Sequence, residues 1–269
     1  MFCMYCGGKI PEGSIFCRHC GKKQAQVDDT PTPTPVPTDE FAELDAFFAD
    51  AAAEKREQER IEEMFDIQGG ILVEFKMPDP PVRELVIPEG VTGIGVGAFS
   101  GCTDLTSIVI PHGVTIIEDS AFSSCTDLIS VTIPPSVTSI GKGAFSGCTS
   151  LRTLDIPNSV TDIGNDAFIY CTHLTGISLS NRMMSIGNNT FAQCKSLKSI
   201  VIPNGVTQIG DWVFFGCTSL NSVTIPHSVI YMGSYTFCDC ANLSAVSIPA
   251  HTTTHVFAFE GCPATVIRR

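Results

Sequence analysis

The sequence of 269 residues lacks several features that mark particular classes of protein. It contains no run of 18 or more apolar residues, which excludes a membrane-spanning helix. Only 16% of its residues are charged, and the net charge of −12 makes nucleic-acid binding unlikely, because an acidic chain does not attract phosphates. Residues 1–7 lack a basic stretch leading into a long apolar segment. We therefore expect no secretory signal and a cytoplasmic location, with the cell surface as the alternative.

Two segments near the N-terminus differ from the rest in composition. Residues 28–38 read DDTPTPTPVPT, and four prolines on alternate positions predict an extended linker. Residues 28–66 hold 13 acidic against three basic residues. Within them, residues 39–65 carry apolar side chains at helical spacing and predict an acidic amphipathic helix. This helix docks on the following domain, forms a short coiled coil or partner helix, or is a partly frayed connector.

A metal site is predicted within residues 1–27. Two CxxC pairs, each followed by glycine, point four thiolates at one centre, which suits a tetrahedral Zn²⁺; iron is the alternative metal. Because four thiolates leave no open position, we expect one structural Zn²⁺. The pattern resembles the small zinc ribbon at the N-termini of many bacterial proteins. The predicted ligands are Cys3, Cys6, Cys17 and Cys20.

The remainder of the chain repeats itself every 23 residues. Phenylalanine precedes each repeated cysteine by three positions, and leucine follows all but the last of them, Cys262, by three. An isoleucine or leucine opens each unit, followed by proline in every unit but the one that begins at Leu179. These coincident columns indicate an array of about eight repeats over residues 87–269. The repeated cysteines are Cys102, Cys125, Cys148, Cys171, Cys194, Cys217, Cys240 and Cys262.

One unit shows how such an array would fold. Ile108 and Ile110 alternate as in a strand, and Val114 with Ile117 forms a second extended piece facing inward. The segment from Ala121 to Leu128 favours a tight helical turn. A single unit cannot bury its apolar side, so units must stack. We predict a mainly β solenoid with short helical turns over 66–269, capped by residues 66–86.

The repeated phrase IPxxVTxIGxxAFxxCTxLxSVxIP resembles the BspA-type (Treponema pallidum type) leucine-rich repeat over roughly residues 70–269. The stretch 65–75 is similar to the hairpin that opens such arrays. The resemblance implies a right-handed solenoid with a protein-binding role, and many members of this family are surface adhesins.

The repeated cysteines are expected to be buried, inert thiols, because each stands in an apolar column between phenylalanine and leucine. Cys238 aligns instead with Ser100 and Ser123 in an outward column. We therefore predict that Cys238 is the most reactive thiol of the array.

A group of aromatic residues distinguishes the C-terminal repeats. The column just before the Ala-Phe pair is small or polar in five repeats and aromatic in the last three. Exposed aromatics on adjacent repeats are typical interface anchors. They bind a partner, or they cover the C-terminal end and mediate self-association. The candidate residues are Trp212, Phe215, Tyr231, Tyr235 and Phe257.

The sequence offers no catalytic arrangement, because His112 and His227 lie five repeats apart and no phosphate loop or nucleophile elbow is present. We therefore predict a non-enzymatic protein-interaction scaffold. The alternatives are a cell-surface adhesin exported without a recognisable signal, and a zinc-ribbon regulator that touches nucleic acid.

Zinc removal should affect the N-terminal segment and the repeat array differently. Chelation is expected to unfold residues 1–24, because so short a segment has too little core to fold without its metal, and to leave the repeat array intact. NMR of the full chain before and after chelation checks this. Ribbon signals that persist in metal-free protein would contradict the prediction.

Overall fold

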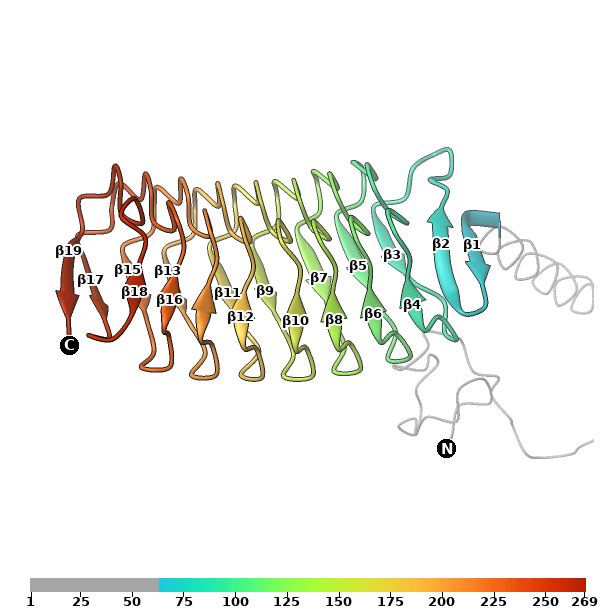
Figure 1. Ribbon diagram of the computed structural model, residues 1–269. Coiled ribbons are helices and arrows are strands. Elements are labelled where there is room, and N and C mark those ends of the chain that lie inside the picture. Colours follow the sequence, from blue (N-terminus) through green and yellow to red (C-terminus); the bar gives the residue numbers. More distant parts are fainter. Residues whose placement is uncertain (1–62) are drawn as a thin grey trace, which may run out of the picture. The chain divides into compact units, whose positions relative to one another are not determined.

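The computed structural model describes residues 63–269, which wind through 19 short strands. Figure 1 shows the strands stacked side by side in sequence order, from β1 at one end to β19 at the other. The predicted zinc ligands, the linker 28–38 and residues 39–62 of the predicted helix lie outside the described residues. Of the described residues, none forms a helix long and apolar enough to cross a membrane.

Each repeat contributes two strands, one to each of two series. The first series holds β3 (Glu84–Val86), β5 (Ser107–Val109), β7 (Ser130–Thr132), β9 (Thr153–Asp155), β11 (Gly176–Ser178), β13 (Ser199–Val201), β15 (Ser222–Thr224), β17 (Ala245–Ile248) and β19 (Thr265–Arg268). The second holds β4 (Gly93–Ile94), β6 (Ile116–Ile117), β8 (Ser139–Ile140), β10 (Asp162–Ile163), β12 (Ser185–Ile186), β14 (Gln208–Ile209), β16 (Tyr231–Met232) and β18 (Thr253–Thr254). The predicted β-solenoid is therefore confirmed.

Equivalent strands pair in parallel with the register of the sequence repeat. Ile108 of β5 lies opposite Val131 of β7, and Ile117 of β6 lies opposite Ile140 of β8. Each residue thus stacks on its counterpart one repeat away, in agreement with the 23-residue period. In most strands one face is buried, while outward-facing residues such as Val86 and Val201 are exposed.

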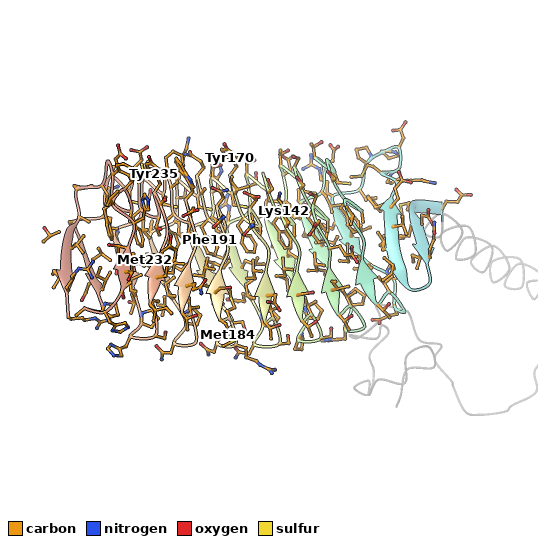
Figure 2. The ribbon with its side chains drawn as sticks, in the orientation of Figure 1. Lys142, Tyr170, Met184, Phe191, Met232 and Tyr235 are labelled. Atoms are coloured by element: carbon orange, nitrogen blue, oxygen red, sulfur yellow. The ribbon has the colours of Figure 1, made fainter. Side chains whose placement is uncertain are left out.

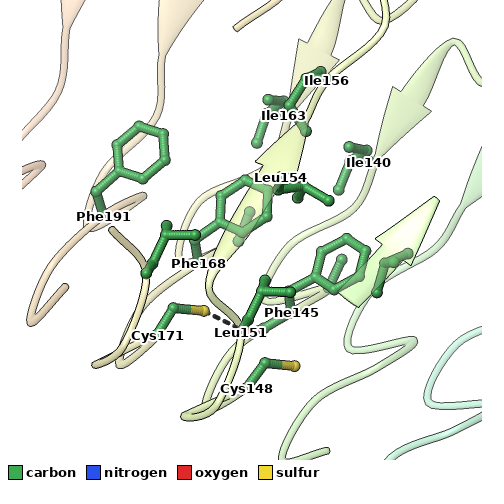
Figure 3. Packing of buried hydrophobic residues seen from close by; sticks show 14 of the residues in the cluster. Ile140, Phe145, Cys148, Leu151, Leu154, Ile156, Ile163, Phe168, Cys171 and Phe191 are labelled. Atoms are coloured by element: carbon green, nitrogen blue, oxygen red, sulfur yellow. Dashed lines mark hydrogen bonds between the residues drawn. The ribbon is translucent and has the colours of Figure 1, made fainter. Parts of the chain in front are cut away.

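The core is a set of columns of identical side chains. Seven phenylalanines from Phe99 to Phe237 are fully buried, with neighbouring ring centroids 5.0–5.7 Å apart and ring planes within 14° of parallel. Figure 3 shows Phe145, Phe168 and Phe191 in this column, with Cys148 and Cys171 beside it. Offset stacking of this kind contributes about 0.5–1.5 kcal/mol per pair beyond the burial of the rings.

An antiparallel hairpin opens the array. It consists of β1 (Phe65–Gln68) and β2 (Ile71–Phe75), and β2 pairs in parallel with β4. Its phenylalanines extend the core column, since Phe65 lies 5.3 Å from Phe75 and Phe75 lies 5.1 Å from Phe99. Phe65 therefore belongs to a strand, and including it in the predicted helix 39–65 was wrong, because it pairs with Phe75 in the hairpin and its ring packs on that of Phe75.

The predicted helical turns were also wrong, because no helix forms among residues 65–269. The segment after each second-series strand makes isolated turns, such as Ala121 N–H to the Glu118 carbonyl and Cys125 N–H to the Phe122 carbonyl, both 3.3 Å. Left-handed residues interrupt them: Ser120 has φ 56° and Ser124 has φ 60°. A positive φ breaks the run of right-handed residues that any helix requires.

One repeat interrupts both series of strands. β10 does not pair with β12, nor β11 with β13, whereas the other breaks among the described strands affect the first series alone. This repeat reads LSNRMMSIG in place of IPxxVTxIG. Met184 occupies the place of a threonine whose hydroxyl elsewhere bonds the preceding repeat, as Thr138 does to the Thr115 carbonyl, and it is 69% exposed. The sequence signal for this break was the missing proline after Leu179.

Truncation of a core ring tests the importance of the phenylalanine column. Phe168→Ala is expected to lower the free energy of unfolding by about 3–5 kcal/mol, because the cavity lies between two stacked neighbours. Phe259→Ala, at the half-buried last ring, is the matched control and should cost clearly less. Urea unfolding followed by circular dichroism measures both, and equal losses would contradict this account.

Candidate functional site

The aromatic residues singled out above come together at the C-terminal repeats. Trp212, Tyr235 and Phe257 follow β14, β16 and β18, so the parallel register brings their rings into one stack. The centroids of Trp212 and Tyr235 are 4.2 Å apart, and those of Tyr235 and Phe257 are 5.4 Å apart. Phe215 meets Trp212 edge to face at 4.9 Å. We call these four residues the aromatic cluster.

Tyr231 is not part of this cluster. It lies in β16, opposite Gln208 of β14, and makes no aromatic pair among residues 63–269. Its side chain is 41% exposed. The sequence analysis placed it with the cluster because both sets occupy the same repeats, but the strand directs it into a different outward row.

The stacked rings stand on an unusual backbone. Trp212 has φ 60° and Tyr235 has φ 54°, both in the left-handed region. The same column holds glycine at Gly97 and Gly143, which adopt this conformation without a steric penalty. A left-handed bulky residue is rare and costs of order 1 kcal/mol or more, so its retention requires a compensating interaction. Ring stacking supplies part of that compensation.

A row of polar side chains holds the turn that carries the cluster. Asn165 Oδ1 accepts the Asn188 N–H at 2.8 Å, and Asn188 Oδ1 accepts the Asp211 N–H at 2.9 Å. Asp211 Oδ1 in turn accepts the Ser234 N–H at 2.7 Å. Because each bond joins one repeat to the next, the turns before Trp212 and Tyr235 are fixed relative to each other. This row was not predicted from the sequence.

The repeated cysteines are free thiols, buried as predicted except for the half-buried Cys262, and those from Cys125 to Cys240 each donate to a carbonyl of the preceding repeat. The Cys171 thiol donates to the Phe145 carbonyl at 3.2 Å, and the Cys217 thiol donates to the Phe191 carbonyl at 3.2 Å. The same Phe145 carbonyl also accepts the Cys148 N–H at 3.2 Å. A buried carbonyl thereby uses both lone pairs. Burial raises the pKa of Cys171 and of Cys217 to about 12.

Cys238, predicted from its outward column to be the most reactive thiol, is covered instead. Its side chain is only 8% exposed, because the last turn of the chain lies over it, with the Glu260 carbonyl accepting the Asp239 N–H at 3.2 Å. Burial, followed by the nearby Asp239 and Glu260 carboxylates, raises the pKa of Cys238. Among the described cysteines, Cys262 is the one that is more than marginally accessible.

Two exposed residues of the array escaped the sequence analysis. Tyr170 is 53% exposed and left-handed, with φ 62°. Figure 2 shows it on the same edge of the array as Tyr235. The sequence does distinguish this position, because Tyr170 is aromatic where three other repeats carry a glycine, namely Gly101, Gly147 and Gly216. Gln208, the neighbour of Tyr231, could not be singled out from the sequence, because the residue at its position differs from repeat to repeat.

Within residues 63–269, no group of three or more His, Cys, Asp or Glu side chains is arranged to hold a metal ion. The four cysteines predicted to bind zinc lie outside this range.

Comparison with known proteins identifies relatives of the repeat array. The profile of the BspA type Leucine rich repeat region matches residues 75–191 and 161–268, with six copies. A leucine-rich repeat protein from Bacteroides ovatus is 30% identical, with a TM-score of 0.63, over 73% of this chain and 59% of that chain. The T. pallidum leucine-rich repeat protein is 28% identical, with a TM-score of 0.61, over 67% of this chain and 88% of that chain.

A leucine-rich repeat protein from Eubacterium ventriosum is 26% identical, with a TM-score of 0.55, over 68% of this chain and 59% of that chain. This chain thus spans about three fifths of the length of the Bacteroides and Eubacterium proteins. Comparison with curated proteins gave no match.

The buried thiols predict a loss of stability at alkaline pH. Below about pH 8.5 neither state ionises these thiols, so their contribution is fully present. Between that pH and about 12, Cys171 and Cys217 lose their protons in the unfolded chain but keep them in the folded protein. The free energy of unfolding therefore falls by about 1.4 kcal/mol per pH unit for each thiol.

Cys171→Ala/Cys217→Ala should therefore show a shallower decline than wild type. Urea unfolding at a series of pH values from 8 to 11, followed by circular dichroism, measures both slopes. Equal slopes in the variant and in the wild type would contradict the raised pKa of the two thiols.

Proposed function

This chain belongs to the BspA-type leucine-rich repeat family, and on that premise we propose that it is a non-catalytic scaffold that binds a protein partner through the aromatic cluster. Solenoids present extended surfaces that suit protein partners. The single observation that carries the proposal is the ring stack formed by Trp212, Tyr235 and Phe257 on adjacent repeats.

Three properties of the cluster support binding. Phe257 is 45% exposed, and Trp212 and Tyr235 are half-buried, so apolar area remains for a partner to cover. Within residues 63–269, the Trp212 indole N–H and the Tyr235 hydroxyl have no hydrogen-bond partner. Tryptophan and tyrosine that combine apolar area with an available donor are the residues most enriched at binding hot spots.

The backbone supports the same interpretation. Glycine would relieve the left-handed strain at Trp212 and Tyr235, as it does at Gly97 and Gly143. Large rings at strained positions are a recurrent mark of functional sites. Self-association through these C-terminal repeats is the second candidate, because a second copy could cover the same exposed rings.

We further propose that Cys3, Cys6, Cys17 and Cys20 hold one structural Zn²⁺. Four thiolates complete a tetrahedral shell, so the metal would stabilise its segment and supply no open position for a substrate. Thiolates and free cysteines persist best where disulfide formation is disfavoured. This chemistry favours a cytoplasmic location over the cell-surface alternative.

Replacing two of the rings by glycine tests the interface. Trp212→Gly/Tyr235→Gly should abolish partner capture and leave the thermal midpoint nearly unchanged, because relief of backbone strain offsets the lost stacking of about 0.5–1.5 kcal/mol. Capture from native lysate, compared by quantitative mass spectrometry, measures the first effect. Sedimentation of the purified chain shows whether the partner is a second copy.

Ser120→Ala, in the same column four repeats earlier, is the control and should capture the same proteins as wild type. Identical captured sets and identical sedimentation for wild type and the glycine variant would refute an interface here. A large fall in the thermal midpoint would show that the rings serve packing.

A further inference from the structure

A shallow cavity lies on the second series of strands, and none of the residues of the aromatic cluster lines it. Its volume is about 260 Å³, and three successive strands, β12, β14 and β16, form its walls. Ser185, Gln208 and Tyr231 stand opposite one another in the strand register and form one row of exposed side chains. Asn188 and Asp211 form a second row, three residues further along the chain.

The floor between the two rows is free of side chains for a physical reason. Gly187 and Gly210 lie there, and a Cβ atom at either position would overlap the side-chain oxygen of Asn165 or of Asn188. Those oxygens are held in place by the bonds they accept from Asn188 N–H and Asp211 N–H. The polar row that joins the repeats therefore requires glycine beside it, and the trough results.

The cavity walls carry polar groups that the protein does not use. Within residues 63–269, the Ser185 hydroxyl, the Gln208 amide and the Tyr231 hydroxyl take part in no hydrogen bond. In the second row Asn188 and Asp211 each engage only Oδ1, which leaves the Asn188 amide N–H₂ and Asp211 Oδ2 available. Donors and acceptors thus alternate around a small space beside one aromatic ring.

We propose that this cavity binds a neutral saccharide. Sugar hydroxyls act as donors and acceptors at once, which matches a lining of one amide N–H₂, one carboxylate oxygen, one glutamine amide and two hydroxyls. The Tyr231 ring offers an apolar surface for the C–H face of a pyranose. No cationic side chain lines the cavity, so phosphates and other anions lack a counter-charge.

The backbone beneath the site is fixed before a ligand arrives. Strand pairing fixes Ser185 opposite Gln208 and Gln208 opposite Tyr231, so on binding only the side chains of the first row need to be ordered. The cavity is smaller than the range of about 300–1,000 Å³ typical of drug-sized ligands, which suits one sugar ring or two. Because it is shallow and polar, we expect a Kd on the order of 1 mM.

Saturation-transfer NMR on the full-length protein tests the proposal, with glucose, galactose, mannose, N-acetylglucosamine, maltotriose and chitotriose as probes. At least one probe should give a transfer signal. Gln208→Ala and Tyr231→Phe should each weaken binding about fivefold, since each removes one hydrogen bond of about 1 kcal/mol. Ser139→Ala, in the same row on β8 and outside the cavity, is the control and should leave binding unchanged.

Two outcomes would overturn the proposal: none of the six sugars gives a transfer signal with wild type, or the signal is undiminished in Gln208→Ala/Tyr231→Ala. Gln208 and Tyr231 are both exposed, so we expect their variants to fold as wild type does. The thermal midpoint of each variant checks this. The test is independent of the proposed interface, because loss of sugar binding leaves the aromatic cluster intact.

Discussion

Parallel pairing between successive repeats is the constraint on which the rest of this structure depends. Short strands of two to five residues have little stability alone, so each must hydrogen-bond to its counterpart one repeat away. That pairing stacks equivalent side chains of successive repeats, which produces the phenylalanine column and the bonds from the thiols of Cys125 to Cys240 to the preceding repeat. A change at one position is therefore felt mainly by the two neighbouring repeats.

The same constraint separates stability from function. Inward columns keep residues of similar size, and the phenylalanine and cysteine columns keep the same residue, because their side chains pack on the equivalent side chains of neighbouring repeats. Outward columns bear no such requirement and vary from repeat to repeat. The aromatic cluster and the polar cavity both arise where outward columns depart from the small residues found elsewhere. The strained backbone at Trp212 and Tyr235 shows that such a departure can persist against a local energetic cost.

The repeat between β11 and β12 shows how far the pattern can be relaxed. It lacks the proline of the other repeats and the threonine of most of them, and both series of strands are interrupted there. The buried columns nevertheless continue through Met183, Ile186 and Phe191. Core packing is thus maintained where strand pairing lapses, because apolar burial is non-directional whereas a hydrogen bond requires alignment.

The sequence by itself determined the period, the inward columns and the existence of the solenoid, because stacking copies the spacing of residues directly into space. It also assembled Trp212, Tyr235 and Phe257, which share one column. Only the tertiary structure decided where Tyr231 points, that Cys238 is covered, and that the turns are left-handed instead of helical. Those features depend on backbone dihedral angles and on contacts between different columns, neither of which a one-dimensional period encodes.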